Sequence, residues 1–547
     1  MGVESAEVLS PAGKSIPRKN DRPIARRRVW SYKCGMSRAV LAAGMLLTWL
    51  LAGALPVLAQ SEGGVLRVGL TALPSTLDPA AAADLPARLV ARQIFDTLVQ
   101  FRPTSSDVEP GLASQWSVSK DGLVWTFRLR DGVLFHDGTA LTAHHVVTSI
   151  ERQMFSGHAL APAGLAVAPA LLRGAPGVIK ELRVPDSRTV LIRLKQPYAP
   201  LITVLAHPAL SVVLPSSDGT ARWLGTGPFS LAEITAGRIA LDANRGYWGG
   251  APRLSRVVFQ EVSDEARAIV DLDDRALEVW IPPGAPSRLA GALSVPGWRI
   301  GFLAMQTEKE PFSRRKVRQA VAAALNLGQI GSAVEPSAAP LPSFLPPGLW
   351  GRVDGPPLLR GDVATARRLL SEAALSRGIS TTLLVAGGPG AHGQERLAEA
   401  IRSMLAPAGI AVQPQFMSPG EMLALAQSGE HQMVLMEARA EVGDPHFLLF
   451  PLSTTEGARR GPSGWNLSFY RNGRLDDLLI RASQLSFRLE RQRVYGRAQA
   501  MLAEEMPWIP LYVRLHWAVV RPEVRGLRLH PSGQYRFDRV TVDPPAR

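Results

Sequence analysis

Residues 110–152 have the sequence PGLASQWSVSKDGLVWTFRLRDGVLFHDGTALTAHHVVTSIER. Apolar side chains alternate with polar ones in its middle, at Trp125, Phe127 and Leu129. A period of two is typical of a strand that buries one face. The pair Asp131-Gly132 follows as a turn signal, so we predict a β-hairpin over 123–135.

The same kind of analysis predicts strands and helices in alternation along the rest of the chain. Strand-like runs occupy 65–70, 187–194, 253–262, 381–386, 410–417 and a strand pair in 511–520. Amphipathic helices are predicted at 86–98, 314–326, 361–375 and 394–409. The order strand, helix, strand in the second half is a βαβ pattern, so the chain is predicted to be an α/β protein.

The composition excludes several classes of protein. The chain has 547 residues, 46% hydrophobic and 20% charged, which suits two or three folded domains rather than a disordered chain. The single cysteine, Cys34, excludes a disulfide framework and a cysteine-rich zinc site. The net charge of +14 comes from scattered basic residues rather than a basic stripe with interleaved aromatics, so no nucleic-acid partner is expected.

The N-terminus has the features of an export signal. Residues 39–59 carry no charge, follow Arg38 and a run of arginines, and end in Val57-Leu58-Ala59 after Pro56. We predict cleavage after Ala59, which leaves an exported mature chain. The stretch is also long enough to serve as a permanent membrane anchor. A lipoprotein is not expected, because glutamine rather than cysteine follows the cleavage site.

One glycine-rich segment has the spacing of an enzyme motif. Gly388-Pro-Gly390-Ala-His392-Gly393 matches G-x-G-x-x-G between a predicted strand and a predicted helix. The dinucleotide fingerprint also needs an acidic residue at the end of the next strand, where Gln413 and Gln415 stand instead. The loop therefore joins strand to helix, and its backbone N–H groups suit an anion without forming a nucleotide site.

No other catalytic or metal-binding pattern is present in the sequence. It contains no H-E-x-x-H, no G-x-S-x-G and no P-loop motif. We therefore expect no enzymatic activity, no cofactor and no metal site.

The stretch that opens this section resembles the signature of family 5 extracellular solute-binding proteins, which are receptors of ABC importers. Further matching segments follow in the family's order: LDPA (77–80), IFDTLV (94–99), GTGPF (225–229), YWGGAP (247–252), PFSRRKVRQAVAAALN (311–326), FLPPG (344–348), GDPHFLLFPL (443–452), NLSFYRNGRLDDLL (466–479) and MPWIPLY (506–512). So many fragments in one order make the resemblance specific.

The resemblance implies the fold and the domain boundaries. The expected fold is an α/β, two-lobed periplasmic-binding-protein clamshell, of the type II, large peptide-binding class, with mixed sheets flanked by helices. Residues 1–59 would be an N-terminal extension and signal peptide. The first lobe would span 60–295 together with 510–547, which returns to it, and the second would span 296–509.

The resemblance also implies ligand-binding residues between the lobes. Glu441 takes the place of the acid that holds the amino group of a peptide in relatives, with a solvated loop acid as the alternative. Asp84, Trp465 and Asn466 fall in regions that face the cleft, although core packing is an alternative for Trp465.

One expected ligand contact is missing from this sequence. Dipeptide-type relatives use an arginine after the strand that matches 381–386, and 387–394 contain none. We therefore expect the loop with Gly388, Gly390 and His392 to face an anionic or polar end of the ligand. This departure puts strict dipeptide recognition in doubt.

The function implied is capture of a peptide-like or other small solute in the periplasm and its delivery to ABC permease subunits in the inner membrane, by a monomer. The ligand stays open among dipeptide, oligopeptide, nickel chelate, haem and opine. Two alternatives remain: a secreted enzyme that uses the Gly388–Gly393 loop, and a receptor module that senses a ligand without transport.

Overall fold

The computed structural model describes residues 63–162, 167–216, 223–354, 361–388 and 392–544. The chain from Glu62 onward forms one compact unit, and the predicted signal peptide with its cleavage after Ala59 lies outside the described residues. Within the described residues there is no helix both long enough and apolar enough to cross a bilayer.

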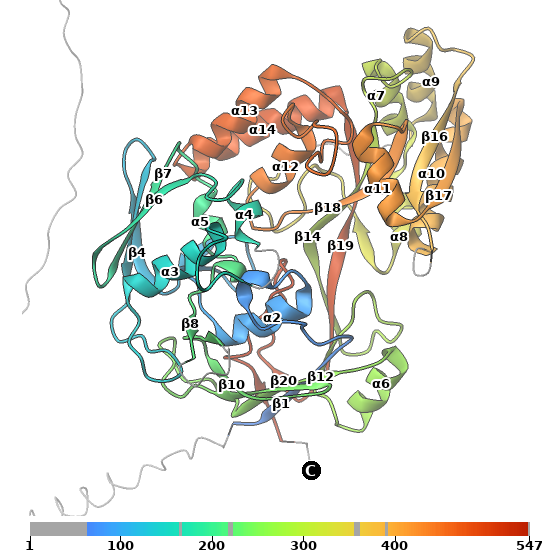
Figure 1. Ribbon diagram of the computed structural model, residues 1–547. Coiled ribbons are helices and arrows are strands. Elements are labelled where there is room, and N and C mark those ends of the chain that lie inside the picture. The colour runs from blue at the N-terminus through green and yellow to red at the C-terminus, as the bar shows by residue number, and fades with distance from the viewer. Residues whose placement is uncertain (1–62, 163–166, 217–222, 355–360, 389–391, 545–547) are drawn as a thin grey trace, which may run out of the picture. The chain divides into compact units, whose positions relative to one another are not determined.

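The largest element is an eleven-stranded mixed sheet (Figure 1). Its strands follow the order β10 (Phe229–Thr235), β11 (Arg238–Ala243), β12 (Arg256–Glu261), β1 (Val65–Leu70), β13 (Val279–Ile281), β19 (Trp508–Val520), β14 (Ala292–Met305), β18 (Met433–Arg439), β16 (Ile379–Ala386) and β17 (Ile410–Met417), with β15 (Ala338–Pro340) on β19. β1 is parallel to both neighbours, and β16 is parallel to β17 and β18. Runs of buried apolar residues in β1 and β16 fit this arrangement, because parallel strands are usually covered on both faces.

Two long strands run through both halves of this sheet. Residues 292–296 of β14 pair with 515–519 of β19, next to β13. Residues 300–304 of β14 pair with 508–513 of β19, next to β18. The register shifts between Pro296 and Ile300, which marks a β-bulge in β14 where the first half of the sheet gives way to the second.

A second, four-stranded sheet has the order β4 (Ala113–Val118), β5 (Val124–Leu129), β7 (Thr189–Leu194) and β6 (Ile179–Asp186). The alternation at 125–129 does form a strand, but the hairpin predicted over 123–135 is wrong. β5 pairs with β4 and β7, so both of its edges are occupied. Beyond Gly132 the chain makes a single bridge, Leu134 to Ala140.

Short ribbons and helices complete the described residues. The ribbons are β2 (Val99–Phe101) with β3 (Val108–Pro110), β8 (Leu214–Pro215) with β9 (Trp223–Leu224), and β20 (Val524–Arg525) with β21 (Thr541–Val542). The helices of the first half are η1 (Pro79–Ala81), α2 (Leu85–Ile94), α3 (Ala143–Met154), α4 (Ala168–Leu171), α5 (Leu201–Val204), η2 (Pro208–Leu210) and α6 (Glu265–Asp273). Those of the second half are α7 (Arg315–Ala324), α8 (Leu327–Val334), α9 (Val363–Glu372), α10 (His392–Leu405), η3 (Ala406–Ala408), α11 (Pro419–Ser428), α12 (His446–Ser453), α13 (Gly473–Gln484) and α14 (Arg488–Glu505).

The predicted βαβ unit is present as β16, α10 and β17, with parallel strands. The strand pair predicted in 511–520 is wrong, because this segment belongs to the single continuous strand β19. The C-terminal tail supplies Val524, Tyr535 and Phe537 to the hydrophobic core that also contains β1 and α2. The lobe boundaries themselves remain a prediction.

Candidate functional site

Charged and polar side chains gather on the strands that run through both halves of the large sheet. We call the following set the central polar strip: Arg299 on β14, Glu437 and Arg439 on β18, and Tyr512 and Arg514 on β19. Alternate residues of a strand share a face, and the register places Arg299 opposite Arg439. The strip therefore lies beside the bulge in β14.

Glu437 is the acceptor at the middle of this strip. Tyr512 Oη donates to its Oε1 at 2.8 Å, Arg514 Nε donates to the same atom at 2.6 Å, and Arg299 Nη1 lies 3.6 Å from Oε2. Gln394, in the first turn of α10, donates from Nε2 to Tyr512 Oη at 2.8 Å. Burial and the neighbouring Glu437 raise the pKa of Tyr512, so its hydroxyl stays protonated and donates.

Glu441 is held between two arginines from distant parts of the chain. Arg439 Nη2 reaches both carboxylate oxygens, at 2.9 and 2.8 Å, and Arg88 Nη1 lies 3.2 Å from Oε2. Arg88 comes from α2, is buried, and also donates to the carbonyls of Ala82 and Ala83. The carboxylate predicted to meet a ligand amine is thus already shared by two guanidinium groups.

The space beside this cluster is small. The cavity lined by Arg88, Trp298, Arg439, Ala440, Glu441, His516, Pro531, Ser532 and Gln534 measures about 10 Å³. That volume holds about one water molecule. A solute would enter only if α2 and the strands of the strip moved apart.

Two of the other predicted residues have structural roles. Asp84 caps α2, because its Oδ1 accepts the Ala87 N–H at 2.7 Å. Its charge also lies close enough to Arg88 to affect that guanidinium electrostatically. Asn466 is buried and donates from Nδ2 to the carbonyls of Thr454 and Tyr470, which braces its loop.

Trp465 and Gly388 are exposed, whereas Asn466 is buried. The Trp465 side chain is 39% exposed, so it is not a core residue. Gly388 has φ +111°, which favours glycine, and an added Cβ would meet nothing within 4 Å. Gly390 lies outside the described residues, and His392 is the first residue of α10.

Most residues of the central polar strip, and Arg88 beside it, were not predicted from the sequence. The omitted residues are Arg88, Arg299, Gln394, Glu437, Arg439, Tyr512 and Arg514. One signal was available, because Glu437-Ala-Arg439-Ala-Glu441 places charges of alternating sign at every second position of a strand. Among the described residues no group of three or more His, Cys, Asp or Glu is arranged to hold a metal ion.

A close approach at Gly301 positions Tyr512 in the strip. An added Cβ on Gly301 would lie 2.1 Å from Cε1 and Cζ of Tyr512, much closer than van der Waals contact allows. We predict that Gly301→Ala displaces the ring, breaks its hydrogen bonds to Glu437 and Gln394, and lowers the free energy of unfolding by about 1–3 kcal/mol.

Urea unfolding of the mature chain measures this effect. Gly420→Ala is the matched control, because that glycine lies in α11 with nothing within 4 Å of an added Cβ. Equal unfolding free energies for the two variants would contradict the role assigned to Gly301.

Comparison with known proteins gives a consistent family match. The family model described as bacterial extracellular solute-binding proteins, family 5 (middle) matches residues 107–459. The chain is 30% identical over 532 residues to "Di/tripeptide-binding protein 2" of Pseudomonas aeruginosa (strain UCBPP-PA14), which covers 90% of this chain and 98% of the relative. It is 28% identical over 486 residues to "Heme-binding protein A" of Haemophilus influenzae (strain ATCC 51907 / DSM 11121 / KW20 / Rd), covering 83% and 87%.

The fold is similar to that of solved structures as well. HbpA2 from Haemophilus parasuis superposes with a TM-score of 0.82 at 25% identity, covering 88% of this chain and 100% of that one. This likeness confirms the α/β, two-lobed binding-protein fold predicted from the sequence.

Proposed function

Because this chain belongs to the bacterial extracellular solute-binding proteins of family 5, we propose that it captures a peptide-like or other small solute between two lobes and delivers it to ABC permease subunits in the inner membrane. The observation that carries this proposal is the polar cluster where the two halves of the sheet meet. There Arg88 from α2 and Arg439 from β18 share Glu441. The proposed lobes are 60–295 with 510–547, and 296–509.

The two alternative functions have less support. Relatives in this family are named as binding proteins, so we propose that the chain is not an enzyme. Saturable binding without turnover distinguishes a binding protein from an enzyme. Neighbouring genes for permease and ATPase subunits distinguish transport from sensing alone.

Native mass spectrometry of protein purified from its own periplasm tests the proposal directly. We expect a monomer whose mass corresponds to a chain that begins at Gln60, together with a ligand that co-purifies. An intact N-terminus found in the membrane fraction would contradict the proposed export as a soluble protein. Release of a chemically changed ligand with turnover would contradict the binding role.

The charges around the strip favour a ligand with an anionic end. The strip together with the neighbouring Arg88 and Glu441 contains four arginines and two glutamates, namely Arg88, Arg299, Arg439 and Arg514 against Glu437 and Glu441. Arg299 is the least engaged of the four, since its side chain is 50% exposed and its carboxylate partner lies 3.6 Å away. We therefore propose that Arg299 binds a ligand carboxylate. Arg88 and Arg439 stay paired with Glu441 and add positive charge nearby.

We predict that Arg299→Gln weakens binding of a carboxylate-bearing ligand at least tenfold, about 1.4 kcal/mol. Glu441→Gln should change the affinity less than tenfold, because this carboxylate pairs with Arg88 and Arg439. Isothermal titration with the co-purified ligand measures both, with Arg288→Gln as a control that removes an exposed charge paired with Asp273. A tenfold or larger loss in Glu441→Gln alone would support the amine-binding role inferred from the sequence.

We predict that ligand binding closes the two lobes about the bulge in β14. The water-sized space at Glu441 and the register shift after Pro296 support this junction as the site where the backbone angles change. Small-angle scattering at saturating ligand should show a smaller radius of gyration than an open ligand-free state. An identical profile with and without ligand would indicate a rigid receptor.

A further inference from the structure

A large basic cavity lies between elements of residues 92–253 and the C-terminal tail, and shares no residue with the central polar strip. Its volume is about 630 Å³. Its lining comes from α2, the β2–β3 ribbon and the loop after β2, Arg130, Ala206, the segment 247–253 and the C-terminal tail 526–539. Seven arginines line it: Arg92, Arg102, Arg130, Arg253, Arg528, Arg536 and Arg539. The acidic side chains in the lining are Glu109 and Asp538.

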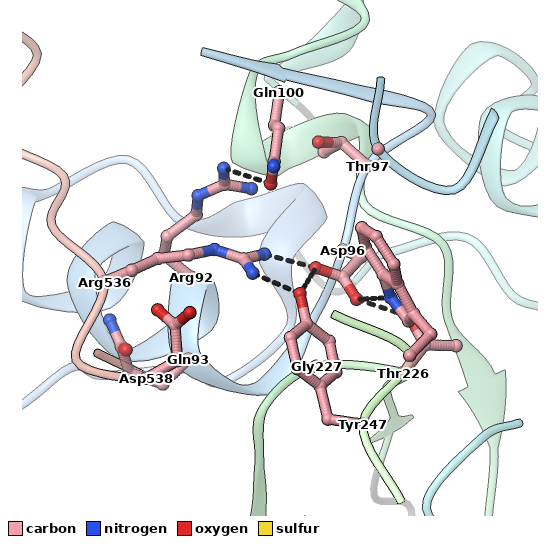
Figure 2. Close-up of polar contacts among 12 residues, drawn as sticks. Arg92, Gln93, Asp96, Thr97, Gln100, Thr226, Gly227, Tyr247, Arg536 and Asp538 are labelled. Atoms are coloured by element: carbon pink, nitrogen blue, oxygen red, sulfur yellow. Dashed lines mark hydrogen bonds and ion pairs between the residues drawn. The ribbon is translucent and has the colours of Figure 1, made fainter. Parts of the chain in front are cut away.

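One of these arginines, Arg536, forms an ion pair with the buried carboxylate of Asp96 (Figure 2). Asp96 is buried and accepts hydrogen bonds from Arg536, from Trp248 Nε1 at 2.8 Å and from Thr226 Oγ1 at 3.1 Å. Arg536 also donates to Tyr247 Oη. This carboxylate therefore forms its ion pair with Arg536 and acts on the neighbouring Arg92 only through space, without a hydrogen bond.

Arg92 is buried, yet within the described residues it makes no ion pair or hydrogen bond with a carboxylate. Its residue is 7% exposed, its Nη2 donates to the neutral amide oxygen of Gln100 at 3.3 Å, and its Nη1 has no partner among the described residues. Burial and the neighbouring Arg536 lower the pKa of Arg92 to about 9, so it is still charged at neutral pH. A buried charge is unfavourable unless a counter-charge accompanies it.

Other donors around the cavity are also unsatisfied. Arg536 Nε and Tyr535 Oη are buried without a partner among the described residues. Arg253 and Arg528 are exposed at the cavity and make no side-chain hydrogen bond or ion pair within the described part of the chain. The cavity thus combines surplus positive charge with free hydrogen-bond donors, which is the complement of an oxyanion.

We propose that this cavity is a second ligand site, which binds the phosphate or pyrophosphate group of a small molecule. Several guanidinium groups around one cavity suit the several oxygens of a phosphate better than a single carboxylate. The volume lies within the range of small-molecule pockets, and Phe101, Tyr247 and Trp248 supply aromatic surface for an organic part. The site goes beyond the transport role proposed above and does not depend on it.

Titration of the mature chain with sodium pyrophosphate at constant ionic strength tests this proposal. Wild type should bind saturably by calorimetry, and its melting temperature should rise with pyrophosphate concentration. Arg92→Met should bind at least tenfold more weakly. Without pyrophosphate, its melting temperature should equal or exceed that of wild type, because the unpaired buried charge is gone.

Two further variants make the result decisive. Arg193→Gln on β7 removes an exposed charge away from the cavity lining and should bind like wild type. Arg528→Gln, exposed at the cavity, should weaken binding at least threefold and serves if Arg92→Met does not fold. Absence of saturable binding by wild type, or equal affinity in wild type, Arg92→Met and Arg528→Gln, would overturn the proposal.

The source of the phosphate group is distinguished with lipid vesicles. Flotation with phosphatidylglycerol vesicles that excess pyrophosphate abolishes would assign the group to a lipid. Pyrophosphate binding without flotation would assign it to a soluble molecule. Flotation that pyrophosphate leaves unchanged, together with no saturable pyrophosphate binding, would contradict the site.

Discussion

Replacing Asp444 by alanine is expected to lower the free energy of unfolding by about 3–5 kcal/mol. Asp444 is fully buried, and its Oδ1 accepts from Arg491 Nη2 at 2.8 Å and from Tyr495 Oη at 3.4 Å. Arg491 is also buried, so the substitution leaves a guanidinium charge inside the protein without a counter-ion. Urea unfolding of the mature chain measures the loss.

An exposed ion pair provides the control for this prediction. Asp273 pairs with Arg288 at 2.7 Å, and both side chains are largely exposed, so Asp273→Ala should cost about 0–1 kcal/mol. The double variant with Arg491→Met should recover part of the loss in Asp444→Ala, because no buried charge remains. A loss in Asp444→Ala as small as that in Asp273→Ala would contradict the buried ion pair.

A loss of similar size, about 3–5 kcal/mol, is expected for Asp96→Ala. This carboxylate joins the end of α2 to Thr226, to Trp248 and to Arg536 in the C-terminal tail. Without it, Arg536 keeps its charge but loses its counter-ion. Hydrogen exchange should therefore show faster opening of the tail 526–544 than in wild type, in addition to the lower unfolding free energy.

The pH dependence of stability checks the role of the Asp96 charge. Burial by itself would raise the pKa of Asp96, but Arg536 together with the hydrogen bonds to it holds that pKa below its usual value. The stability contributed by the ionised group is present above the unfolded pKa of about 3.9 and is lost as the pH falls through the folded pKa. Wild type should thus lose more stability than Asp96→Asn on acidification below about pH 4. Parallel curves for the two proteins would contradict a stabilising charge.

Local patterns in the sequence were sufficient for most individual elements. The alternation at 125–129 predicted β5, and the amphipathic pattern at 361–375 predicted α9. Such patterns depend on neighbours within a few positions, because a strand or helix buries one face at its own period. The hairpin at 131–132 failed because strand pairing depends on β7, which lies about 60 residues further along the chain.

At the candidate site, too, the sequence predicted what depends on local motifs but not which distant residues meet. The order of motifs along the chain identified the family and with it the two-lobed fold, and the same order directed attention to Glu441. No pattern in the sequence shows that Arg88, 353 residues away, shares the Glu441 carboxylate with Arg439. The sequence therefore predicted that Glu441 binds a ligand amine, but it could not show that Arg88 and Arg439 already occupy this carboxylate.

The sequence by itself thus determined the α/β class, the family and most elements, because these depend on local periodicity and on the order of motifs. Only the tertiary structure decided which charges meet. It paired Asp444 with Arg491 and Asp96 with Arg536, and it left Nη1 of the buried Arg92 without a hydrogen-bond partner among the described residues. The physical reason is that electrostatic partners are set by how helices, loops and the C-terminal tail pack together. This packing brings together residues 47 positions apart in the first pair and 440 in the second, in a medium of low dielectric constant.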